Sequence, residues 1–512
     1  MMKARTMTFS IHEVLELAKN HRVVPVIEEL FSGAESPVAI FEKVASRRPG
    51  SFLLESAEHG VWSRYSFIGV NARGILSQDQ SGEVSWFSPT GESALPVSNG
   101  RELPTRALEA LDAMTSAWTS PAIEGLPPLT SGLVGALAWD TIREIEHLPS
   151  PPLKVFDSPL MVFTMVRDAI IIDHQTSKLL LVSNVFVDDD SNVEADYREA
   201  LSHIESLRES LLAESIPFIA RLEDGNATEP ISNMQNDDFL AMVTKAKHFV
   251  EIGDVFQVVL SQRFDYPTQA SPLDIYRALR ALNPSPYMYL LNFGDGEGKY
   301  SIIGSSPEAL VKVSEGHATM HPIAGSRPRG KDWDSDQALE ASLLEDAKER
   351  AEHLMLVDLA RNDLLKVCEP TTVNVTEFMQ VHKFSHIQHL VSTVEGRVRH
   401  NQSSIDVFKA TFPAGTLSGA PKPRALEIID QLEKHNRGLF GGVVGYFDFA
   451  GNADLAIAIR TVFLRDSVAR VQAGAGIVLD SVPQSEADET RSKASAPLKA
   501  VAVASSFEKL TK

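Results

Sequence analysis

The stretch NDDFLAMVTKAKHFVEIGDVFQVVLSQRF, residues 236 to 264, places a helix directly before a strand. Asn236 or Asp237 can cap the helix, and apolar residues then recur at helical spacing until Gly253. The run from Val255 to Phe264 has the pattern of a strand. The stretch therefore predicts a fold that contains both kinds of element.

The segments on either side continue this mixture without a regular alternation of strands and helices, which predicts the α+β class. We expect strands at Met161–Val166, Ala169–His174, Leu179–Val185, Met288–Phe293, Tyr300–Ile303, Leu310–Val313, Val443–Phe449 and Val468–Gly474. We expect helices within Met1–Asn20 and over about Asp334–Leu365 and Gln484–Phe507.

The chain has 512 residues, of which 43% are hydrophobic, and this is enough for more than one ordinary core. A polar run from Leu222 to Gln235 is the better of two candidate boundaries, the other being Ala117 to Ser131. We therefore expect a sheet-rich domain over residues 1–225 and a second domain over residues 236–512.

Charge and cysteine content exclude several classes of partner. The 48 basic and 68 acidic residues give a formal net charge of -20, which disfavours nucleic acid and anionic membranes as partners. The single cysteine, Cys368, cannot form an internal disulfide. The N-terminal segment lacks the apolar core of a signal peptide, and no stretch approaches the length of a membrane span. A soluble cytoplasmic protein is expected.

Two pairs of glutamates have a spacing that places both carboxylates of a pair on one helix face. Glu349 and Glu352 are three residues apart, as are Glu486 and Glu489. Such a pair usually belongs to a solvated face. Two pairs of equal spacing, one in line with apolar Leu356, instead indicate a site for a hard cation such as Mg²⁺. A substrate carboxylate could complete its shell.

Other residues suit an anionic substrate, although each has an ordinary structural explanation. Arg460 lies in an apolar context and needs an anionic partner, either a substrate carboxylate or a structural ion pair. Lys493 could bind substrate or pair with Glu489, and His389 is either a packing residue or an acid or base. Glycine lets a backbone approach an anion closely, but most glycines serve turns. The glycine-rich turns are residues 412–422, 441–442 and 472–476.

Five strings resemble the chorismate-binding enzyme family, and together they span roughly residues 236 to 504. They are Ile303-Gly-Ser-Ser-Pro-Glu308, His321-Pro-Ile-Ala-Gly-Ser-Arg-Pro-Arg-Gly330, Glu352-His-Leu-Met-Leu-Val-Asp-Leu-Ala-Arg-Asn-Asp363, Gly415-Thr-Leu-Ser-Gly-Ala-Pro-Lys422, and Ala473-Gly-Ala-Gly476 through Glu489. Further strings resemble the anthranilate-forming branch of that family: Ser51-Phe-Leu-Leu-Glu-Ser56, Arg64-Tyr-Ser-Phe-Ile-Gly69 and Asn283-Pro-Ser-Pro-Tyr-Met288.

The resemblance implies a two-layer, β-sandwich-like fold with helices covering the sheets and two intimately packed subdomains. It implies that chorismate loses its 4-hydroxyl as ammonia enters the ring, after which pyruvate is eliminated to leave anthranilate, on the route to tryptophan. Mg²⁺ would bind the ring carboxylate, with Glu352 and Glu489 as direct ligands and Glu349 and Glu486 in support.

The same resemblance implies roles for further residues. Those that match positions holding substrate carboxylates are Arg460, Lys493, Gly474, Ala475 and Gly476. Those that match catalytic positions around the reacting ring are His389, Glu308 and Thr416, and those that match further substrate-binding positions are Gly325, Ser326 and Gln257. His389 is the expected acid for departure of the hydroxyl. Departures from the family pattern are Ser326, Phe440, Leu365 and Ser492.

Two positions distinguish this chain from similar enzymes with other reactions. Water-adding members of the family carry a lysine where Gln257 stands, and glutamine cannot act as that base. Members that make aminodeoxychorismate place a lysine nucleophile where Ala324 stands. Alanine therefore favours direct attack by ammonia, with aminodeoxychorismate synthesis as the alternative.

The N-terminal strings also resemble a feedback site for tryptophan. These residues could instead be ordinary hairpin and turn residues. A chain that kept only this site would be a non-catalytic tryptophan sensor. The residues of the expected inhibitor site are Glu55, Ser56, Tyr65, Asn283, Pro284, Ser285, Pro286, Tyr287 and Met288.

The source of ammonia indicates a partner. Glutamine hydrolysis needs a nucleophilic cysteine with histidine support, and the sequence around Cys368 lacks the turn expected of an amidotransferase. A separate glutamine amidotransferase subunit is therefore expected to deliver ammonia.

Overall fold

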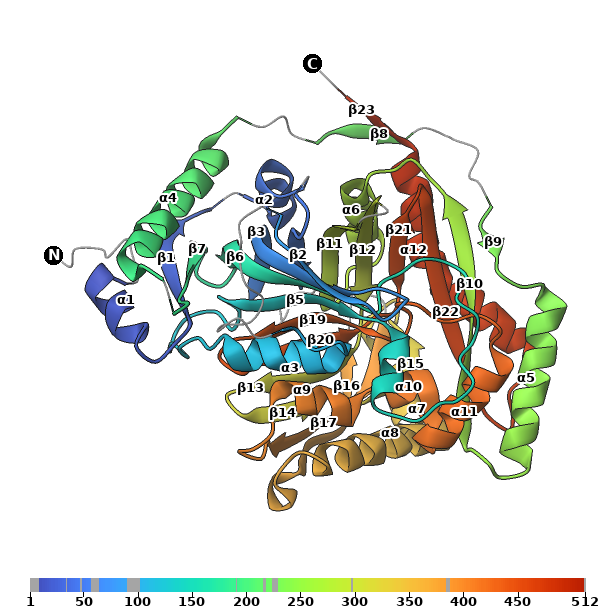
Figure 1. Cartoon of the computed structure of the whole chain (residues 1–512). Coiled ribbons are helices and arrows are strands. Elements are labelled where there is room, and N and C mark those ends of the chain that lie inside the picture. Colours follow the sequence, from blue (N-terminus) through green and yellow to red (C-terminus); the bar gives the residue numbers. More distant parts are fainter. Residues whose placement is uncertain are drawn as a thin grey trace.

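The computed structural model describes residues 9–33, 35–46, 48–56, 64–89, 102–189, 191–214, 218–222, 229–295, 298–383 and 387–510. Helices and strands are mixed along the chain, which confirms the α+β class (Figure 1). The helices are α1 (Ile11–Leu17), α2 (Pro37–Val44), α3 (Ala107–Ala117), α4 (Val193–Leu212), α5 (Asn236–Glu251), α6 (Pro272–Leu282), α7 (Trp333–Glu345), α8 (Ala347–Leu365), α9 (Ser404–Thr411), α10 (Gly415–Ser418), α11 (Lys422–Leu432) and α12 (Pro483–Ser505), with 3₁₀ turns at Trp139–Glu144 and Pro370–Thr372.

The strands occur throughout both halves of the chain. They are β1 (Val23–Phe31), β2 (Phe52–Glu55), β3 (Tyr65–Gln78), β4 (Val84–Phe87), β5 (Gly132–Leu137), β6 (Met161–Asp173), β7 (Lys178–Phe186), β8 (Ala220–Leu222), β9 (Ile231–Ser232), β10 (Gln257–Pro267), β11 (Tyr287–Asp295), β12 (Gly298–Ser306), β13 (Ala309–Ser314), β14 (His317–Met320), β15 (Ile323–Pro328), β16 (Asn374–Lys383), β17 (Ile387–Arg397), β18 (Gly419–Ala420), β19 (Val443–Asp448), β20 (Ala453–Ile457), β21 (Thr461–Arg465), β22 (Val468–Ile477) and β23 (Phe507–Lys509).

Antiparallel pairing joins most of these strands into one large sheet that divides at β6. Every residue of β6 is buried, as its run of valine, isoleucine, phenylalanine and methionine favours. One edge of β6 pairs with β3, and the other pairs with β5 near Met161 and with β7 near Asp173. From β3 the sheet continues through β2, β11, β12, β21 and β22 to β10. From β5 it continues through β19 and β20 to β13.

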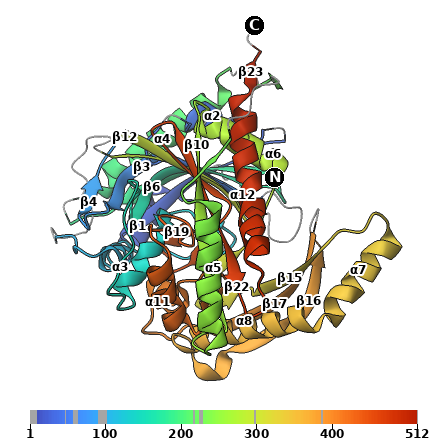
Figure 2. The same cartoon turned by 90° about the vertical axis from the view of Figure 1, so that its right-hand side faces the viewer.

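Several helices of the second half pack on two parts of the sheet, the β10–β22 pair and the β15–β17 region. α12 packs along β22 and beside α5, and both helices face the viewer in Figure 2. α8 packs on β15 and β17, and together with α7 and β16 they form an arm that extends from the main body (Figure 2). Within the described ranges, no helix combines the length and the apolar character needed to cross a membrane.

The hydrophobic cores do not separate along the predicted domain boundary. One cluster of buried side chains combines Val24 and Ile170 from the first half with Leu290 and Ala500 from the second. The pairings of β2 with β11 and of β5 with β19 also cross the boundary. Residues 223–228 of the predicted boundary run lie outside the described residues. The division into residues 1–225 and 236–512 stays a prediction.

A break at Asp346 divides the single helix predicted over Asp334–Leu365, so that prediction is wrong at this residue. α7 ends before Asp346 and α8 begins after it. The side chain of Asp346 accepts hydrogen bonds from the backbone amides of Lys348 and Glu349 at 3.0 and 3.1 Å. It therefore acts as the N-cap of α8. The N-cap of α5 is likewise Gln235, one residue before the predicted cap.

The two strands predicted at Met161–Val166 and Ala169–His174 are one strand, β6. Asp168, between them, is fully buried, because Ser183 and Asn71 donate hydrogen bonds to its carboxylate at 2.7 and 2.6 Å. A polar residue that finds its partners inside the sheet does not need a turn.

Candidate active site

Two adjoining cavities contain most of the residues predicted to act on substrate. The first cavity, about 340 Å³, is bordered by β15, β17, β22 and the short helix α10. The second cavity, about 490 Å³, lies between α8 and α12. Ile323, Ala324, Thr416 and Lys493 line both, so the two cavities adjoin at these residues.

Glu308, between β12 and β13, brings an acidic group to the wall of the first cavity. Burial raises the pKa of its carboxyl to about 7. The hydroxyl of Thr416 donates a hydrogen bond to Glu308 Oε1 at 2.9 Å and partly offsets that rise. A carboxyl with a pKa near neutrality is substantially protonated there and can act as an acid.

His389 on β17 lies across from a bulge in β15 at Gly325, next to Ser326. Its Nδ1 is 3.0 Å from the carbonyl oxygen of Gly325. Nδ1 must carry the hydrogen, because a carbonyl oxygen only accepts. Burial lowers the pKa of the imidazole, so the neutral ring predominates near pH 7 and Nε2 is an acceptor. Gly325 has a φ of +71°, and a Cβ there would approach Glu349 Oε2 to 3.1 Å, which explains the glycine.

Arg460 brings a guanidinium to the first cavity without a carboxylate partner among the described residues. It follows β20 at a φ of +49° and does not continue that apolar strand. Its Nη1 makes a long hydrogen bond, 3.4 Å, to Oδ1 of Asn283. Burial lowers the pKa of the guanidinium. A largely buried cation of this kind is suited to a carboxylate ligand.

Three of the four predicted metal ligands line the second cavity: Glu352 from α8, and Glu486 and Glu489 from α12. Burial raises the pKa of Glu352, and the negative charges of Glu349 and Glu489 raise it further. Burial also raises the pKa of Glu486, with Glu489 again adding to the rise. These carboxylates therefore repel one another across the cavity.

Basic side chains pair with the other carboxylates of this group. Lys493 Nζ lies 2.7 Å from Glu489 and donates to the carbonyl of Gly474 at 3.1 Å. Arg327 pairs with Glu349 at 3.3 Å, and Glu349 does not line the second cavity. In the part of the chain that the structure describes, no three His, Cys, Asp or Glu side chains are gathered closely enough to hold a metal ion.

The backbone of β22 forms a wall of both cavities. Gly474 lines the first cavity and Gly476 the second, whereas Ala475 packs its side chain in the core and lines neither. Gln257, at the start of β10, lines the second cavity. A Cβ at Gly476 would lie 2.2 Å from Gln257 Nε2, so glycine leaves the space that this amide occupies.

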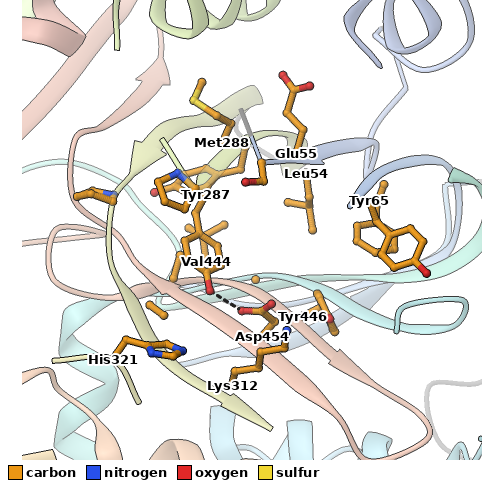
Figure 3. A pocket seen from close by; sticks show the side chains of 18 of the residues that line it. Leu54, Glu55, Tyr65, Tyr287, Met288, Lys312, His321, Val444, Tyr446 and Asp454 are labelled. Atoms are coloured by element: carbon orange, nitrogen blue, oxygen red, sulfur yellow. Dashed lines mark hydrogen bonds between the residues drawn. The ribbon is translucent and has the colours of Figure 1, made fainter. Parts of the chain in front are cut away.

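A third cavity, about 380 Å³, contains part of the predicted inhibitor site (Figure 3). It adjoins the first cavity at Pro286, Pro307 and Ile323, which line both. Ser56 and Tyr65 also line it, and the hydroxyl of Ser56 is buried without a hydrogen-bond partner. A hydroxyl group that lines a cavity and has no hydrogen-bond partner in the protein can form a hydrogen bond with a bound ligand.

The charged groups around the third cavity differ in their availability. Glu55 directs its carboxylate to α6, where it accepts hydrogen bonds from Tyr276 at 2.6 Å and Arg280 at 2.5 Å. The hydroxyl of Tyr287 donates to Asp454 at 3.0 Å, the contact drawn in Figure 3. Glu55 therefore already has two partners in the protein.

The loop Asn283–Met288 extends from one cavity to the other. Through Asn283, which accepts the hydrogen bond from Arg460, it also contacts a predicted substrate-binding group. A ligand in the third cavity would touch the same loop. Asn283, Pro284 and Ser285 line the first cavity, Pro286 lines both, and Tyr287 and Met288 line the third.

Several lining residues were absent from the prediction. Lys348 lines the second cavity and Gln472 the first. Both are neighbours of predicted residues, Glu349 and Gly474, so their positions in the motifs could have indicated them. Lys312 and Asp454 in the third cavity come from strands far apart in the sequence, and no local pattern marks them.

Known proteins resemble the chain over nearly its whole length. The family model for chorismate binding enzyme matches residues 52–499. Anthranilate synthase component 1 of Arthrobacter globiformis is 46% identical over 510 residues, covering 98% of this chain and 94% of that relative. Its counterpart in Mycolicibacterium smegmatis is 45% identical over 507 residues, covering 98% and 95%.

Solved structures resemble the fold described above. The crystal structure of anthranilate synthase component I from Streptococcus pneumoniae TIGR4 matches with a TM-score of 0.73 at 33% identity, covering 91% of this chain and 100% of that chain. The menaquinone-specific isochorismate synthase from Escherichia coli shares the fold, with a TM-score of 0.66 at 18% identity over 96% of this chain and 98% of that chain. With the family model matched over residues 52–499 and relatives 45% and 46% identical over nearly the whole chain, the chain belongs to the chorismate-binding enzyme family.

Proposed function

We propose that this enzyme converts chorismate and ammonia to anthranilate and pyruvate, on the route to tryptophan. The observation that carries the proposal is that Glu308 and Arg460 line the first cavity, whereas Glu352, Glu486 and Glu489 line the second cavity, which adjoins it. An acid, a cation for a carboxylate and oxygen donors for a metal thus lie around two adjoining cavities. The names of relatives at 45% and 46% identity support the same reaction.

Glu308 supplies the proton for the departing 4-hydroxyl. As the carbon–oxygen bond breaks, the hydroxyl leaves with that proton as water, and ammonia forms the new carbon–nitrogen bond. The sequence suggested His389 for this role, but its Nδ1 hydrogen faces the carbonyl of Gly325 and its pKa is lowered, whereas Glu308 holds a proton near pH 7. We therefore assign the role of general acid to Glu308, and to His389 the role of orienting the ring of chorismate.

The remaining steps need groups that bind carboxylates and direct the elimination. Arg460 has a guanidinium without an ion-pair partner in the described chain, and Lys493 reaches both Glu489 and the carbonyl of Gly474. We assign these two cations to the carboxylates of chorismate. The new ammonium group then releases one proton, which restores the protonated state of Glu308. In the elimination the ring loses a proton, the bond between the ring carbon and the enolpyruvyl oxygen breaks, and the enolpyruvyl group takes up a proton on its methylene carbon and leaves as pyruvate, so that the aromatic product remains.

Mg²⁺ is the cofactor that the four glutamates suit by donor chemistry. Carboxylates on two facing helices, with the pKa of Glu352 and Glu486 raised by burial and mutual repulsion, are stabilised by a divalent cation. Glu352 and Glu489 would hold the ion, with Glu349 and Glu486 in support. When bound, it would polarise the ring carboxylate. The open arrangement of these side chains is compatible with an ion that keeps water and substrate oxygens in its shell.

Two residues of the second cavity favour amination followed by elimination over other family reactions. Gln257 lacks the basicity that water addition needs, and Ala324 offers no nucleophile for a covalent adduct. The test is to incubate the purified chain with chorismate, ammonium and Mg²⁺. We expect the fluorescence of anthranilate, and its loss when EDTA removes the metal. Consumption of chorismate without fluorescence would favour aminodeoxychorismate synthesis.

A separate glutamine amidotransferase subunit provides the ammonia in this proposal, and both subunits work in the cytoplasm. Cys368 is fully buried, and burial raises the pKa of its thiol to about 11. A thiol that stays protonated and inaccessible cannot attack glutamine. We expect glutamine to replace ammonium only when the amidotransferase is added. Glutamine-dependent turnover by the pure chain would refute this division of labour.

Tryptophan acts as a feedback inhibitor through the third cavity in this proposal. Two observations support a ligand site in this cavity: the buried hydroxyl of Ser56 has no hydrogen-bond partner in the protein, and Tyr65 lines the cavity. The loop Asn283–Met288 provides a route to the substrate site through its contact with Arg460. Occupancy of the third cavity would therefore affect binding of the substrate carboxylate.

A further inference from the structure

A small cavity of about 20 Å³ lies next to the first cavity and is lined by three arginines, Arg263, Arg437 and Arg470. We call it the arginine cavity. Arg263 on β10 lies opposite Gln472 on β22, and Arg470 is two residues before Gln472 on β22. Gln472 and Phe440 line both this cavity and the first. A space of this size accommodates one water molecule or one monatomic ion.

Two of the three arginines at the arginine cavity form ion pairs, and the third does not. Arg263 pairs with Asp265 at 2.7 Å, and Arg437 pairs with Glu433 at 2.8 Å. Arg470 forms no ion pair with any residue that the structure describes. Burial lowers the pKa of its guanidinium. The residues that line the cavity thus include three guanidinium groups and no carboxylate, and Arg470 is the one of the three without an ion pair among the described residues.

Two N–H groups at the arginine cavity lack acceptors. Arg263 Nη1 and Arg470 Nε are buried and have no hydrogen-bond partner, and Arg263 is only 8% exposed. Arg437, in contrast, donates to a carboxylate and to two backbone carbonyls. The Phe156 ring covers the other two arginines, with its centre 4.7 Å from Cζ of Arg263 and 5.3 Å from Cζ of Arg470. The face of the aromatic ring attracts the face of a guanidinium group. The N–H groups of a guanidinium point outward within the guanidinium plane, so Phe156 does not supply the missing acceptors.

A buried donor without an acceptor costs free energy, and a buried charge without a counter-charge costs more. A water molecule could accept hydrogen bonds from the two N–H groups, but it would not give Arg470 a counter-charge. An anion removes both deficits at once. We propose that the arginine cavity binds one monatomic, monovalent anion of chloride size, held by Arg263 Nη1 and Arg470 Nε. In this proposal the bound anion lies next to Gln472 and Phe440, and it stabilises these two side chains, which separate the arginine cavity from the first cavity.

Anomalous diffraction from crystals of the full chain in sodium bromide tests the proposal directly. We expect an anomalous bromide peak in the arginine cavity of the wild type and none in Arg470→Gln. A peak of water size without anomalous signal in the wild type would overturn the proposal. This result does not depend on turnover of chorismate, so it is independent of the proposed function.

Thermal unfolding provides a second measurement. At equal ionic strength, chloride at ten times its dissociation constant should raise the Tm of the wild type by about 1 °C relative to gluconate, which is too large to enter. Arg470→Gln should lose this rise. Arg198→Gln, which changes an arginine with a 75% exposed side chain, is the matched control and should keep it. The same rise in Arg470→Gln as in the wild type would contradict a site at Arg470. If that variant does not fold, the bromide experiment on the wild type decides.

Discussion

Among single residues, Glu308 connects protonation most directly to turnover. Glu308→Gln keeps the shape of the side chain but removes the proton that can be transferred, so kcat should fall by about 10²- to 10⁴-fold. The protonated form is the active one, and burial sets its pKa at about 7. We therefore expect kcat/KM for chorismate to decline as pH rises through that value in the wild type, and the variant to lack this decline.

Thr416 provides the control that separates an acid from a structural residue. Its hydrogen bond lowers the pKa of Glu308, so Thr416→Val should move the decline in kcat/KM to higher pH. Stability should follow the same group. The unfolded carboxyl releases its proton near its ordinary pKa of 4.5 while the folded one holds it until about 7, so the folded state binds more protons and loses stability as pH rises through this window. Urea unfolding of Glu308→Gln should lack that component. An unshifted decline in Thr416→Val would contradict the assignment.

Ser56 tests the inhibitor site at the same scale. Ser56→Ala removes a buried hydroxyl that has no partner in the protein. If tryptophan supplies that partner, the half-inhibiting concentration should rise about tenfold while kcat stays unchanged, since one hydrogen bond is lost. Ser206→Ala, on an exposed position of α4, is the control and should change neither quantity. Unaltered inhibition in Ser56→Ala would remove this residue from the site.

Sequence spacing predicted side chains better than it predicted their partners. Three of the four paired glutamates share the second cavity. Arg460 lacks a carboxylate partner among the described residues, whereas its apolar context had left a structural ion pair open as one of two alternatives. The pairing of Lys493 with Glu489 was one of two alternatives that spacing left open, and the structure has it at 2.7 Å. The orientation of Glu55 toward α6 depends on residues more than two hundred positions away, which no local pattern contains.

At the scale of elements, α8 is fixed to α11 by a buried ion pair. Lys422 Nζ lies 2.9 Å from Asp363, and the two residues are 9% and 3% exposed. Asp363→Ala leaves Lys422 buried without this partner, which should reduce the free energy of unfolding by about 3–5 kcal/mol. Because α8 also contains Glu352, the variant should bind Mg²⁺ more weakly. Urea denaturation and Mg²⁺ titration by calorimetry measure the two effects.

The double variant Asp363→Leu with Lys422→Met is the control for this pair. Replacing both charges with apolar side chains avoids an unpaired buried charge, so most of the lost stability should return. A double variant as unstable as Asp363→Ala would mean that packing, not charge, fixes α8 to α11.

The predicted boundaries of helices and strands were wrong where the residue at the boundary suits two different local structures. Asp346 suits an exposed helix position as well as an N-cap, and only its bonds to the amides of Lys348 and Glu349 decide for the cap. Asp168 suits a turn as well as a buried network, and its contacts with Ser183 and Asn71 decide for the strand. Helices in which apolar residues recur at clear helical spacing, such as α5 and α12, were predicted within two residues of their observed ends.

At the scale of the whole molecule, the sheet joins the two halves that the sequence suggested as domains. β2 of the first half pairs with β11 of the second, so the walls of the third cavity come from both. Strand partners far apart in sequence leave no signal in either strand alone. This is why the polar run before α5 looked like a domain boundary although core and sheet continue across it.

Product analysis with ¹⁵N-labelled ammonium tests the central claim most directly. The purified chain, chorismate and Mg²⁺ are combined with the labelled ammonium, and the products are identified by mass spectrometry. The account predicts anthranilate that carries the label, with pyruvate formed in equal amount. A labelled ring that retains its enolpyruvyl group, or an unlabelled hydroxylated isomer of chorismate, would contradict it.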